Sequence, residues 1–232
     1  MAQTEASKTA QEYYDSDDAD GFYQRIWGGE DIHVGMYASP TEPIFDASRR
    51  TVERMADRLP ELGADHRVLD VGAGYGGAAR ILAERHGCHV TCLNLSVVQN
   101  DRNRQLNEEA GLAGKIDVVD GTFEDLPFPD ADYDVVWSED AILHAGEHRA
   151  EVLAEIVRVL KPGGHLVFTD PMMADDCPEG VLQPIYDRIH LDSLASFGFY
   201  REELGKLGMQ EVEIEDHSKC LPEHYGRVKQ EL

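Results

Sequence analysis

The chain has 232 residues, of which 45 are Asp or Glu and 21 are Lys or Arg, so its formal net charge is −24. Because 42% of the residues are hydrophobic, the composition predicts one folded domain with a substantial core rather than a disordered chain. The negative charge disfavours nucleic acid and anionic membranes as partners, and with no signal peptide or membrane-spanning stretch we expect a cytoplasmic protein.

The basic residues are mostly arginine, with 15 Arg and only 6 Lys. A surface rich in carboxylate and poor in lysine is expected of a halophilic protein, because screening at high salt removes the self-repulsion of such a surface. An ordinary acidic protein is the alternative.

The N-terminal quarter of the chain has a different pattern from the rest. Residues 11–40 combine Tyr, Trp, Gly and acidic residues without periodicity, and they predict a lid or cap. Residues 42–60 predict an amphipathic helix. Its inward positions are Val52, Met55 and Leu59, and its outward positions are Arg50, Arg54 and Arg58. We therefore divide the chain into an N-terminal lid and helix, residues 1–60, and a second region, residues 61–232.

From residue 67 onward, short apolar runs alternate with amphipathic stretches, which predicts a doubly wound α/β sheet. The expected strands are 67–71, 88–94, 116–119, 133–138, 164–170 and 209–216. The expected helices are 76–86, 96–110, 147–160 and 200–207. Residues 171–199 interrupt this alternation as an insertion after the fifth strand, at the sheet edge where such folds bind ligands.

A glycine-rich turn follows the first strand. Gly72, Gly74 and Gly77 match the GxGxxG pattern of dinucleotide sites, so this turn alone is ambiguous. Two residues favour another ligand. Asp70 would repel a pyrophosphate but can hold an ammonium group, and the second strand ends at Asn94 rather than at the acidic residue expected for NAD.

Three longer segments identify the family that this pattern resembles. They are VLDVGAGYGG at 68–77, GTFEDLPFPDADYDVV at 121–136 and RVLKPGGHLVF at 158–168. With them the chain resembles the class I S-adenosylmethionine-dependent methyltransferases. The resemblance implies a Rossmann-like fold with S-adenosylmethionine as cofactor.

The resemblance also implies which residues contact the cofactor. Those expected at the methionine end are Asp70, Gly72, Ala73, Gly74, Gly76, Ser138 and Glu139; those at the ribose are Asn94, Leu95 and Gln99; those at the adenine are Thr122, Phe123 and Glu124; and those from the lid are Trp27, His33 and Gly35. For two of these residues there is an alternative without cofactor contact: Gln99 faces solvent, or Glu124 is a surface charge.

The segments that flank these motifs narrow the choice of methyl acceptor. The run from Tyr13 to Tyr37, WSEDAILHA at 137–145 and FTDPMM at 168–173 resemble the sarcosine/dimethylglycine N-methyltransferases of glycine betaine synthesis. That resemblance implies a small amine acceptor, sarcosine or dimethylglycine. A looser resemblance to cyclopropane-fatty-acid synthases leaves a lipid, sterol-like or quinone acceptor as the alternative, although Val34-Gly35 replaces the Ser-Cys pair expected there. A nucleotide-binding module without turnover is a third possibility.

An amine acceptor needs alignment and dehydration more than a strong base, and an aromatic cage suits a methylated cation. We expect catalytic roles for Tyr14, Trp27, Asp140 and His144, and substrate contacts for Tyr23, Tyr186 and Arg188, with His190 beside them. Alternatives are that Tyr23 is a core residue, that His144 caps a helix and that Arg188 forms a surface ion pair.

No residue pattern indicates a metal site, and we expect a monomer or small homo-oligomer. Folds of this type normally finish with an antiparallel strand. Because the chain stops at Leu232, we expect either a shortened chain or a variant without that strand, with a sheet edge left exposed.

Overall fold

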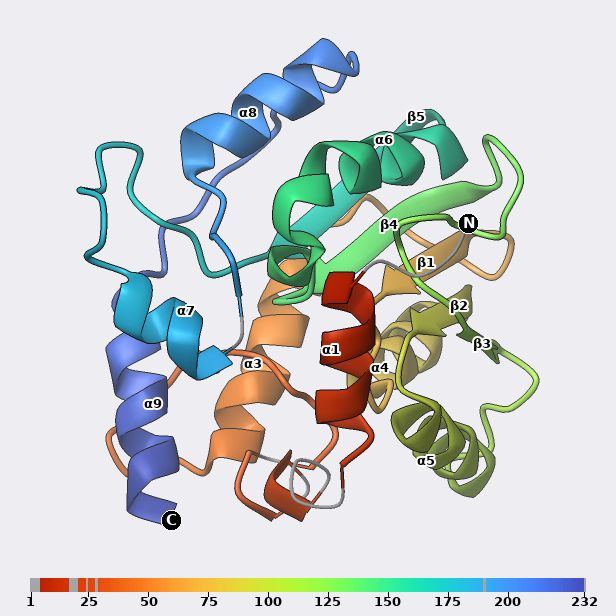
Figure 1. Ribbon diagram of the computed structural model, residues 1–232. Helices are drawn as coiled ribbons and strands as arrows, with labels where there is room; N and C mark the ends of the chain where they lie inside the picture. Colours follow the sequence, from red (N-terminus) through yellow and green to blue (C-terminus); the bar gives the residue numbers. More distant parts are fainter. Residues whose placement is uncertain (1–4, 17–20, 24, 28, 190, 232) are drawn as a thin grey trace.

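A computed structural model describes the chain except for residues 1–4, 17–20, 24, 28, 190 and 232, and Figure 1 shows a sheet with helices on both faces. The strands are β1 (Arg67–Val71), β2 (His89–Asn94), β3 (Ile116–Asp120), β4 (Tyr133–Glu139) and β5 (Leu160–Thr169). All their pairings are parallel, in the order β3-β2-β1-β4-β5. The predicted doubly wound α/β fold is confirmed.

The helices of the described chain connect and cover these strands. They are α1 (Glu5–Tyr14), α3 (Ile44–Ala56), α4 (Gly77–His86), α5 (Val97–Glu109), the 3₁₀ helix η1 (Ile142–His148), α6 (Arg149–Val159), α7 (Gln183–Ile189), α8 (Phe197–Lys206) and α9 (Cys220–Glu231). None of these helices combines the length and apolar character needed to cross a membrane.

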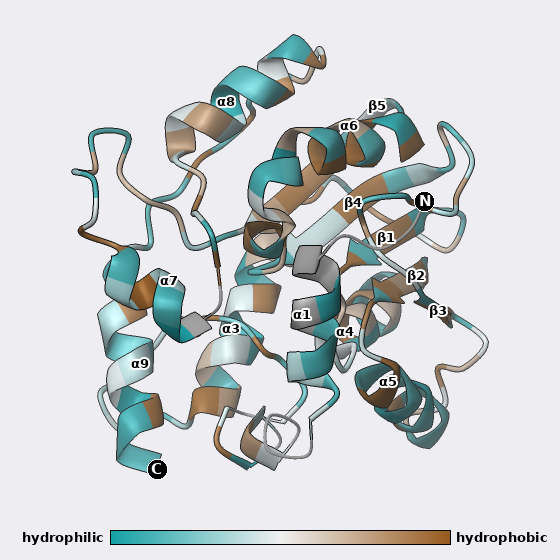
Figure 2. Ribbon diagram, in the orientation of Figure 1, coloured by the Kyte–Doolittle hydropathy of each residue, from teal (hydrophilic) through white to brown (hydrophobic). Residues whose placement is uncertain are grey.

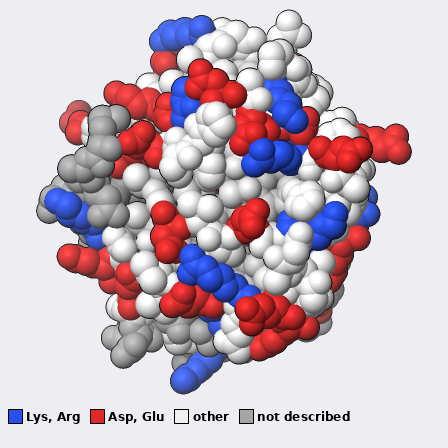
Figure 3. Space-filling view, turned by 90° about the vertical axis from the view of Figure 1, so that its right-hand side faces the viewer, with Lys and Arg blue, Asp and Glu red and all other residues white. Residues whose placement is uncertain are grey.

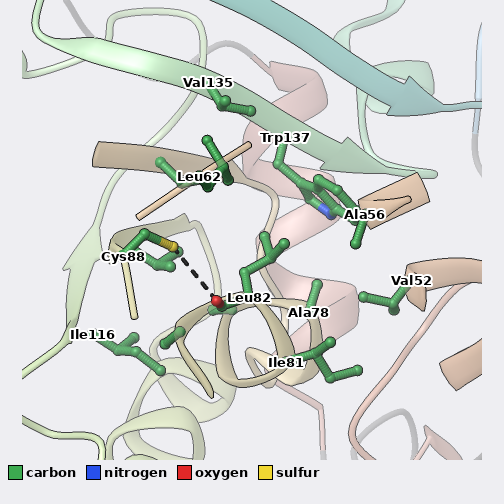
Figure 4. Packing of buried hydrophobic residues seen from close by; sticks show 14 of the residues in the cluster. Val52, Ala56, Leu62, Ala78, Ile81, Leu82, Cys88, Ile116, Val135 and Trp137 are labelled. Atoms are coloured by element: carbon green, nitrogen blue, oxygen red, sulfur yellow. Dashed lines mark hydrogen bonds between the residues drawn. The ribbon is translucent and has the colours of Figure 1, made fainter. Parts of the chain in front are cut away.

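One face of the sheet packs against α3 and α4. Because successive strand residues point to opposite faces, Val68, Val135 and Trp137 lie on this side. They belong to one cluster with Val52 of α3 and Leu82 of α4. Figure 4 shows Val135 and Trp137 on the same side as these helix residues. The amphipathic pattern predicted for residues 42–60 is confirmed in α3, which runs over 44–56.

The opposite face packs against α6 and α8. Leu69, Val71 and Val136 point to this side, where they meet Ile156 of α6 and Tyr200 of α8. Strands buried on both faces are expected to be continuously apolar, and β1 and β2 are largely brown in Figure 2.

The prediction of a sixth strand is wrong. Residues 209–216 form no strand, and Val212 is 85% exposed. Acidic positions of this alternating segment turn to arginines: Glu215 binds Arg54 of α3 at 2.7 Å and Arg58 just after that helix. Glu211 binds Arg201 of α8 at 2.8 Å, so the alternation of charged and apolar residues reflects ion pairing with flanking arginines rather than sheet pairing.

The sheet geometry places two acidic side chains together. In the register of β1 and β4, Asp70 lies opposite Trp137, so Glu139 is two residues further toward the carboxyl end and points to the same face. The strand order changes direction between these two strands, and the crevice at such a point is the usual ligand site of open α/β sheets.

Candidate active site

The turn after β1 depends on glycine for close packing. Gly72, Gly74 and Gly76 all have positive φ, and a Cβ on Gly72 would lie 2.3 Å from the Cβ of Ala141. The amides of Gly72 and Ala73 donate to the Leu93 carbonyl at 2.8 and 3.2 Å, which ties the turn to the end of β2. The turn thus presents bare backbone at the carboxyl edge of the sheet.

Beside this turn lies a cluster that we call the acid–histidine cluster, consisting of Asp31, His33, Asp70 and Glu139. These residues and the turn line one small cavity of about 30 Å³. Within it, Oδ2 of Asp70, Oε1 of Glu139 and Nε2 of His33 have no hydrogen-bond partner. His33 Nε2 and Glu139 Oε1 are 3.5 Å apart.

Burial dominates the electrostatics of this cluster. It raises the pKa of Glu139 to about 7, and Asp31 adds to the shift while His33 opposes it. Burial likewise raises the pKa of Asp70 well above its usual range. For His33, burial lowers the pKa, but the surrounding carboxylates, Glu139 first, outweigh it and the net shift is upward. Asp70 keeps a buried carboxylate oxygen without a hydrogen-bond partner, and the Glu139 carboxylate has His33 at 3.5 Å, so keeping both carboxyls ionised in this cavity is costly.

The N-terminal segment supplies part of the cluster because residues 30–36, which we call the lid strap, pass over the start of α4. A Cβ on Gly77 would meet Oδ1 of Asp31 at 1.9 Å, so Asp31 lies directly against the N-terminus of that helix. The preceding residue, Glu30, accepts hydrogen bonds from Arg80 at 3.0 and 3.2 Å. Arg80 also donates to the Tyr75 carbonyl at 2.7 Å and so joins the lid to the glycine turn.

The predicted ribose residues also come together. Asn94 Nδ2 donates to Oε1 of Gln99 at 3.0 Å, while Nε2 of Gln99 is buried without a partner. Gln99 is 3% exposed, so the alternative that it faces solvent is wrong. Leu95, half-buried, lies between them in sequence.

The predicted adenine residues lie on the loop after β3. Thr122 Oγ1 accepts from the Glu124 amide at 3.3 Å, and Phe123 packs against the apolar cluster that includes Leu126. This loop reaches the ribose side, because the Gly121 amide donates to the Asn94 carbonyl at 3.1 Å. The three predicted residues therefore flank the same edge of the sheet.

Aromatic side chains cover the other side of the crevice. Tyr14 stacks on Tyr23 with ring centroids 5.7 Å apart, and Tyr23 meets Trp27 edge-on at 5.5 Å. Trp27 and Tyr23 are buried. Trp27 Nε1 donates to the His33 carbonyl at 3.2 Å, which links this aromatic group to the acid–histidine cluster.

Tyr14 and His144 meet across the lid and η1. Tyr14 Oη lies 3.2 Å from His144 Nε2. Burial lowers the pKa of His144 to about 4, with Arg149 adding to the shift, so the imidazole is neutral near pH 7. No side chain caps η1 or α6, and the alternative that His144 caps its helix is wrong.

Asp140, at the end of β4, holds the lid strap rather than standing free. Its Oδ2 accepts from the Val34 amide at 2.8 Å and its Oδ1 accepts from Thr169 Oγ1 at 2.9 Å. The backbone at Asp140 has a φ of 48°, in the left-handed region. Ser138, two residues earlier in β4, donates from Oγ to the Val71 carbonyl at 3.0 Å.

His224 of α9 is a site neighbour that the sequence analysis missed. It is fully buried, and its Nδ1 accepts from the Gly35 amide at 3.1 Å and lies 3.0 Å from Tyr37 Oη. Its ring is 4.7 Å from that of Trp27. The helical pattern of residues 222–229 contains this histidine, but nothing local indicates that it meets a segment nearly 190 residues earlier.

The structure keeps the predicted substrate residues of the insertion apart from the cofactor cavity. Tyr186 packs with Leu143, Leu191 and Leu194, and its Oη accepts from the Leu194 amide at 3.4 Å. Arg188 is exposed, with its guanidinium 5.8 Å from the Tyr225 ring. His190 lies outside the described residues.

No group of three or more His, Cys, Asp or Glu side chains in the described part of the chain has an arrangement suited to a metal ion.

Comparisons with known proteins agree with the fold and the turn. Residues 69–168 match the family model described as a methyltransferase domain. The chain is 59% identical to the sarcosine/dimethylglycine N-methyltransferase of Aphanothece halophytica, over 97% of this chain and 81% of the relative. It is 57% identical to the enzyme of the same name from Halorhodospira halochloris, over 98% of this chain and 81% of that relative.

A solved structure is similar over most of its length. A candidate sarcosine dimethylglycine methyltransferase from Galdieria sulphuraria superposes with a TM-score of 0.88 at 44% identity, covering 93% of this chain and 83% of that one.

Proposed function

This chain belongs to the sarcosine/dimethylglycine N-methyltransferase family, and from that premise we propose that it transfers methyl groups from S-adenosylmethionine to sarcosine, dimethylglycine or both. The observation that carries the proposal is the acid–histidine cluster beneath the aromatic side chains, where a buried oxygen of Asp70 lacks a partner and that of Glu139 has only the 3.5 Å ion pair with His33 described above.

The residues present fit S-adenosylmethionine. Oδ2 of Asp70 and Oε1 of Glu139 are the acceptors that its ammonium group needs, and the glycine turn allows backbone to approach the methionine end. The unpartnered Nε2 of Gln99, next to Asn94, is a donor for a ribose hydroxyl. When bound, the cofactor supplies an electrophilic methyl group on a sulfonium.

The acceptor would lie under Tyr14, between the lid and η1. Transfer to an amine is an in-line displacement, so the protein must align the nitrogen and exclude water. A tertiary amine loses no proton on becoming quaternary, and His144 is neutral near pH 7. We therefore assign to Tyr14 and His144 the holding of the acceptor in its reactive, unprotonated form.

The aromatic rings suit the product of the last step. A quaternary ammonium is shielded by methyl groups and is stabilised by the faces of Tyr and Trp rings. Tyr14 and Tyr23 offer stacked rings at the site, while Tyr225 of α9 carries the cation of Arg188 over its face. We propose Arg188 as a partner for the acceptor carboxylate.

Methyl transfer assayed with labelled S-adenosylmethionine tests the proposal. The acceptors are glycine, sarcosine, dimethylglycine and a panel of lipids, sterols and quinones. We expect labelled dimethylglycine or betaine. Transfer to a lipid, sterol or quinone without transfer to any glycine derivative would contradict the amine assignment, and binding of the cofactor without transfer would indicate a module without turnover.

A further inference from the structure

The backbone of Leu143, immediately before His144, is held on both sides by the side chains of half-buried Asp170 and buried Arg149. Asp170 Oδ1 accepts from the Leu143 amide at 3.0 Å, and Arg149 donates from Nη2 to the Leu143 carbonyl at 3.0 Å. Asp170 follows β5 and Arg149 begins α6, so two different elements fix one residue. We call this arrangement the Leu143 clamp.

The clamp controls the direction of the His144 side chain because each peptide unit is planar. Asp170 holds the plane that contains the Leu143 amide. Arg149 holds the next plane, which contains the Leu143 carbonyl and the His144 amide; that amide donates to the Ala141 carbonyl at 3.1 Å. Both planes immediately before the Cα of His144 are therefore fixed.

The clamp is needed because η1 is not a stable element by itself. It is a single 3₁₀ stretch interrupted at Gly146, whose φ and ψ are 56° and −128°, and it follows the left-handed Asp140. Such a stretch offers poor hydrogen-bond geometry, so side chains from outside it must define where His144 lies.

Arg149 extends the clamp to the insertion. Its Nη1 donates to Ser193 Oγ at 3.0 Å, and its Nη2 also donates to the Ser193 carbonyl. The Leu143 side chain packs against Leu191 and Leu194 of the same segment. A shift of this insertion on binding an acceptor would therefore be transmitted to His144 through one guanidinium.

We propose that Arg149 and Asp170 are positioning residues for methyl transfer, which hold the Leu143 peptide so that His144 stays within hydrogen-bond distance of Tyr14 beside the acceptor site. The inference rests on the proposed function, because it concerns the same site. Tyr200 completes the arrangement by donating to Asp170 Oδ2 at 2.5 Å.

The test compares substitutions that break the clamp with one that keeps it. Asp170→Ala removes the acceptor of the Leu143 amide, and Arg149→Met removes the donors to Leu143 and Ser193. We expect each to lower kcat by at least about tenfold, with the Kd for S-adenosylmethionine within about threefold of wild type. Asp170→Asn keeps an oxygen for the Leu143 amide, and we expect its kcat within about threefold of wild type.

Two further variants serve as controls for folding and for charge. Arg149→Lys keeps the buried positive charge but cannot reach Leu143 and Ser193 together, so we expect an intermediate kcat. Ser193→Ala removes only one of the three hydrogen bonds described for Arg149, and its kcat should stay within about twofold of wild type. Thermal unfolding of every variant checks the fold. If Asp170→Ala does not fold, the kcat of Arg149→Lys compared with that of Asp170→Asn still tests the clamp, because only the first of these two substitutions weakens it.

A double-mutant cycle separates this inference from the proposed function. If the clamp acts through His144, Asp170→Ala should slow the His144→Ala enzyme by less than about twofold. The proposed role of the clamp would be wrong if Asp170→Ala slowed the His144→Ala enzyme by the same factor as it slows the wild-type enzyme. It would also be wrong if the Asp170→Asn enzyme were as slow as the Asp170→Ala enzyme. Wild-type kcat in His144→Ala alone would instead contradict the proposed role of His144.

Discussion

At the residue scale, Glu139 is the most informative group, because its ionisation decides what the cavity can hold. Burial raises its pKa to about 7, so near neutral pH the carboxyl is partly protonated in the free protein. An ammonium group stabilises only the ionised form. Binding of S-adenosylmethionine should therefore release a proton from the acid–histidine cluster.

This predicts pH-dependent cofactor binding. Between about pH 8 and about pH 6, protonation of Glu139 should raise the Kd for S-adenosylmethionine about tenfold, since the bound state requires the carboxylate. Protonation of His33 acts in the same direction because it adds a positive charge beside the ammonium. Calorimetric titration at several pH values measures the effect. Glu139→Gln should bind weakly and with a smaller pH dependence than wild type, because only the titration of His33 remains.

The matched control is Glu108→Gln, which alters an exposed carboxylate on α5 away from the cavity. This variant should keep the full pH dependence. A Glu139→Gln protein with wild-type pH dependence would exclude Glu139 as the titrating group.

Tyr14 and Trp27 should respond differently to substitution, although both were predicted as catalytic. Tyr14→Phe removes only the hydroxyl that meets His144, so we expect kcat to fall about tenfold with little change in Tm. Trp27 is buried among Tyr23, His224 and Tyr225, so Trp27→Ala should lower stability by about 3–5 kcal/mol as well as activity. Thermal unfolding and kinetics on the same samples separate the two effects; equal loss of stability in both would contradict this division.

At the element scale, the contact between the lid strap and α4 decides whether the cavity is covered. Residues 30–36 are held by Asp140 at one end of β4, by Arg80 on α4 and by the Thr51 hydroxyl, which donates to the Val34 carbonyl at 2.9 Å. The strap therefore depends on three elements. A change at the strap should alter cofactor affinity without touching the cofactor.

Gly77→Ala tests this contact. The new Cβ would lie 1.9 Å from Asp31 Oδ1 and 2.9 Å from the Glu30 carbonyl, so the strap must move away from α4. We expect the Kd for S-adenosylmethionine to rise at least about tenfold and Tm to fall. The control is Gly114→Ala, where the Cβ meets nothing within 4 Å and φ is not positive. If Gly77→Ala and Gly114→Ala changed the Kd and Tm equally, the contact between the strap and α4 would not be the cause.

The elements themselves were largely predictable from sequence, because parallel strands buried on both faces are apolar whatever their neighbours. Five of the six predicted strands formed, and the helix over 147–160 began at Arg149 after η1. Residues 209–216 were misread, since alternation looks the same whether charged side chains face water or pair with Arg54 and Arg58. The short helix α7 was not predicted, because residues 171–199 lack periodicity.

At the scale of the whole molecule, the acidic surface should set the salt dependence of stability. Figure 3 shows acidic side chains spread over the visible face, several of them beside Lys or Arg. Exposed ion pairs contribute little each, whereas a net charge of −24 repels itself across the whole chain. Screening should therefore stabilise the fold overall.

We expect Tm to rise by several degrees between about 0.1 M and about 2 M KCl, because the Debye length falls to a few ångströms. Thermal unfolding at stepped salt concentrations measures this, with sucrose of equal osmolality as the control for exclusion effects. A Tm that is unchanged or falls with KCl would favour the alternative of an ordinary acidic protein.

Five strands, the glycine turn after β1 and the family could be predicted from sequence, because each depends on residues close together in the chain. The neighbours of the site could not, because they come from segments far apart in the chain. His33 and Glu139, Tyr14 and His144, and Gly35 and His224 are each more than a hundred residues apart. Which of these side chains meet depends on how lid, η1 and α9 pack at the sheet edge, and no local pattern encodes that packing.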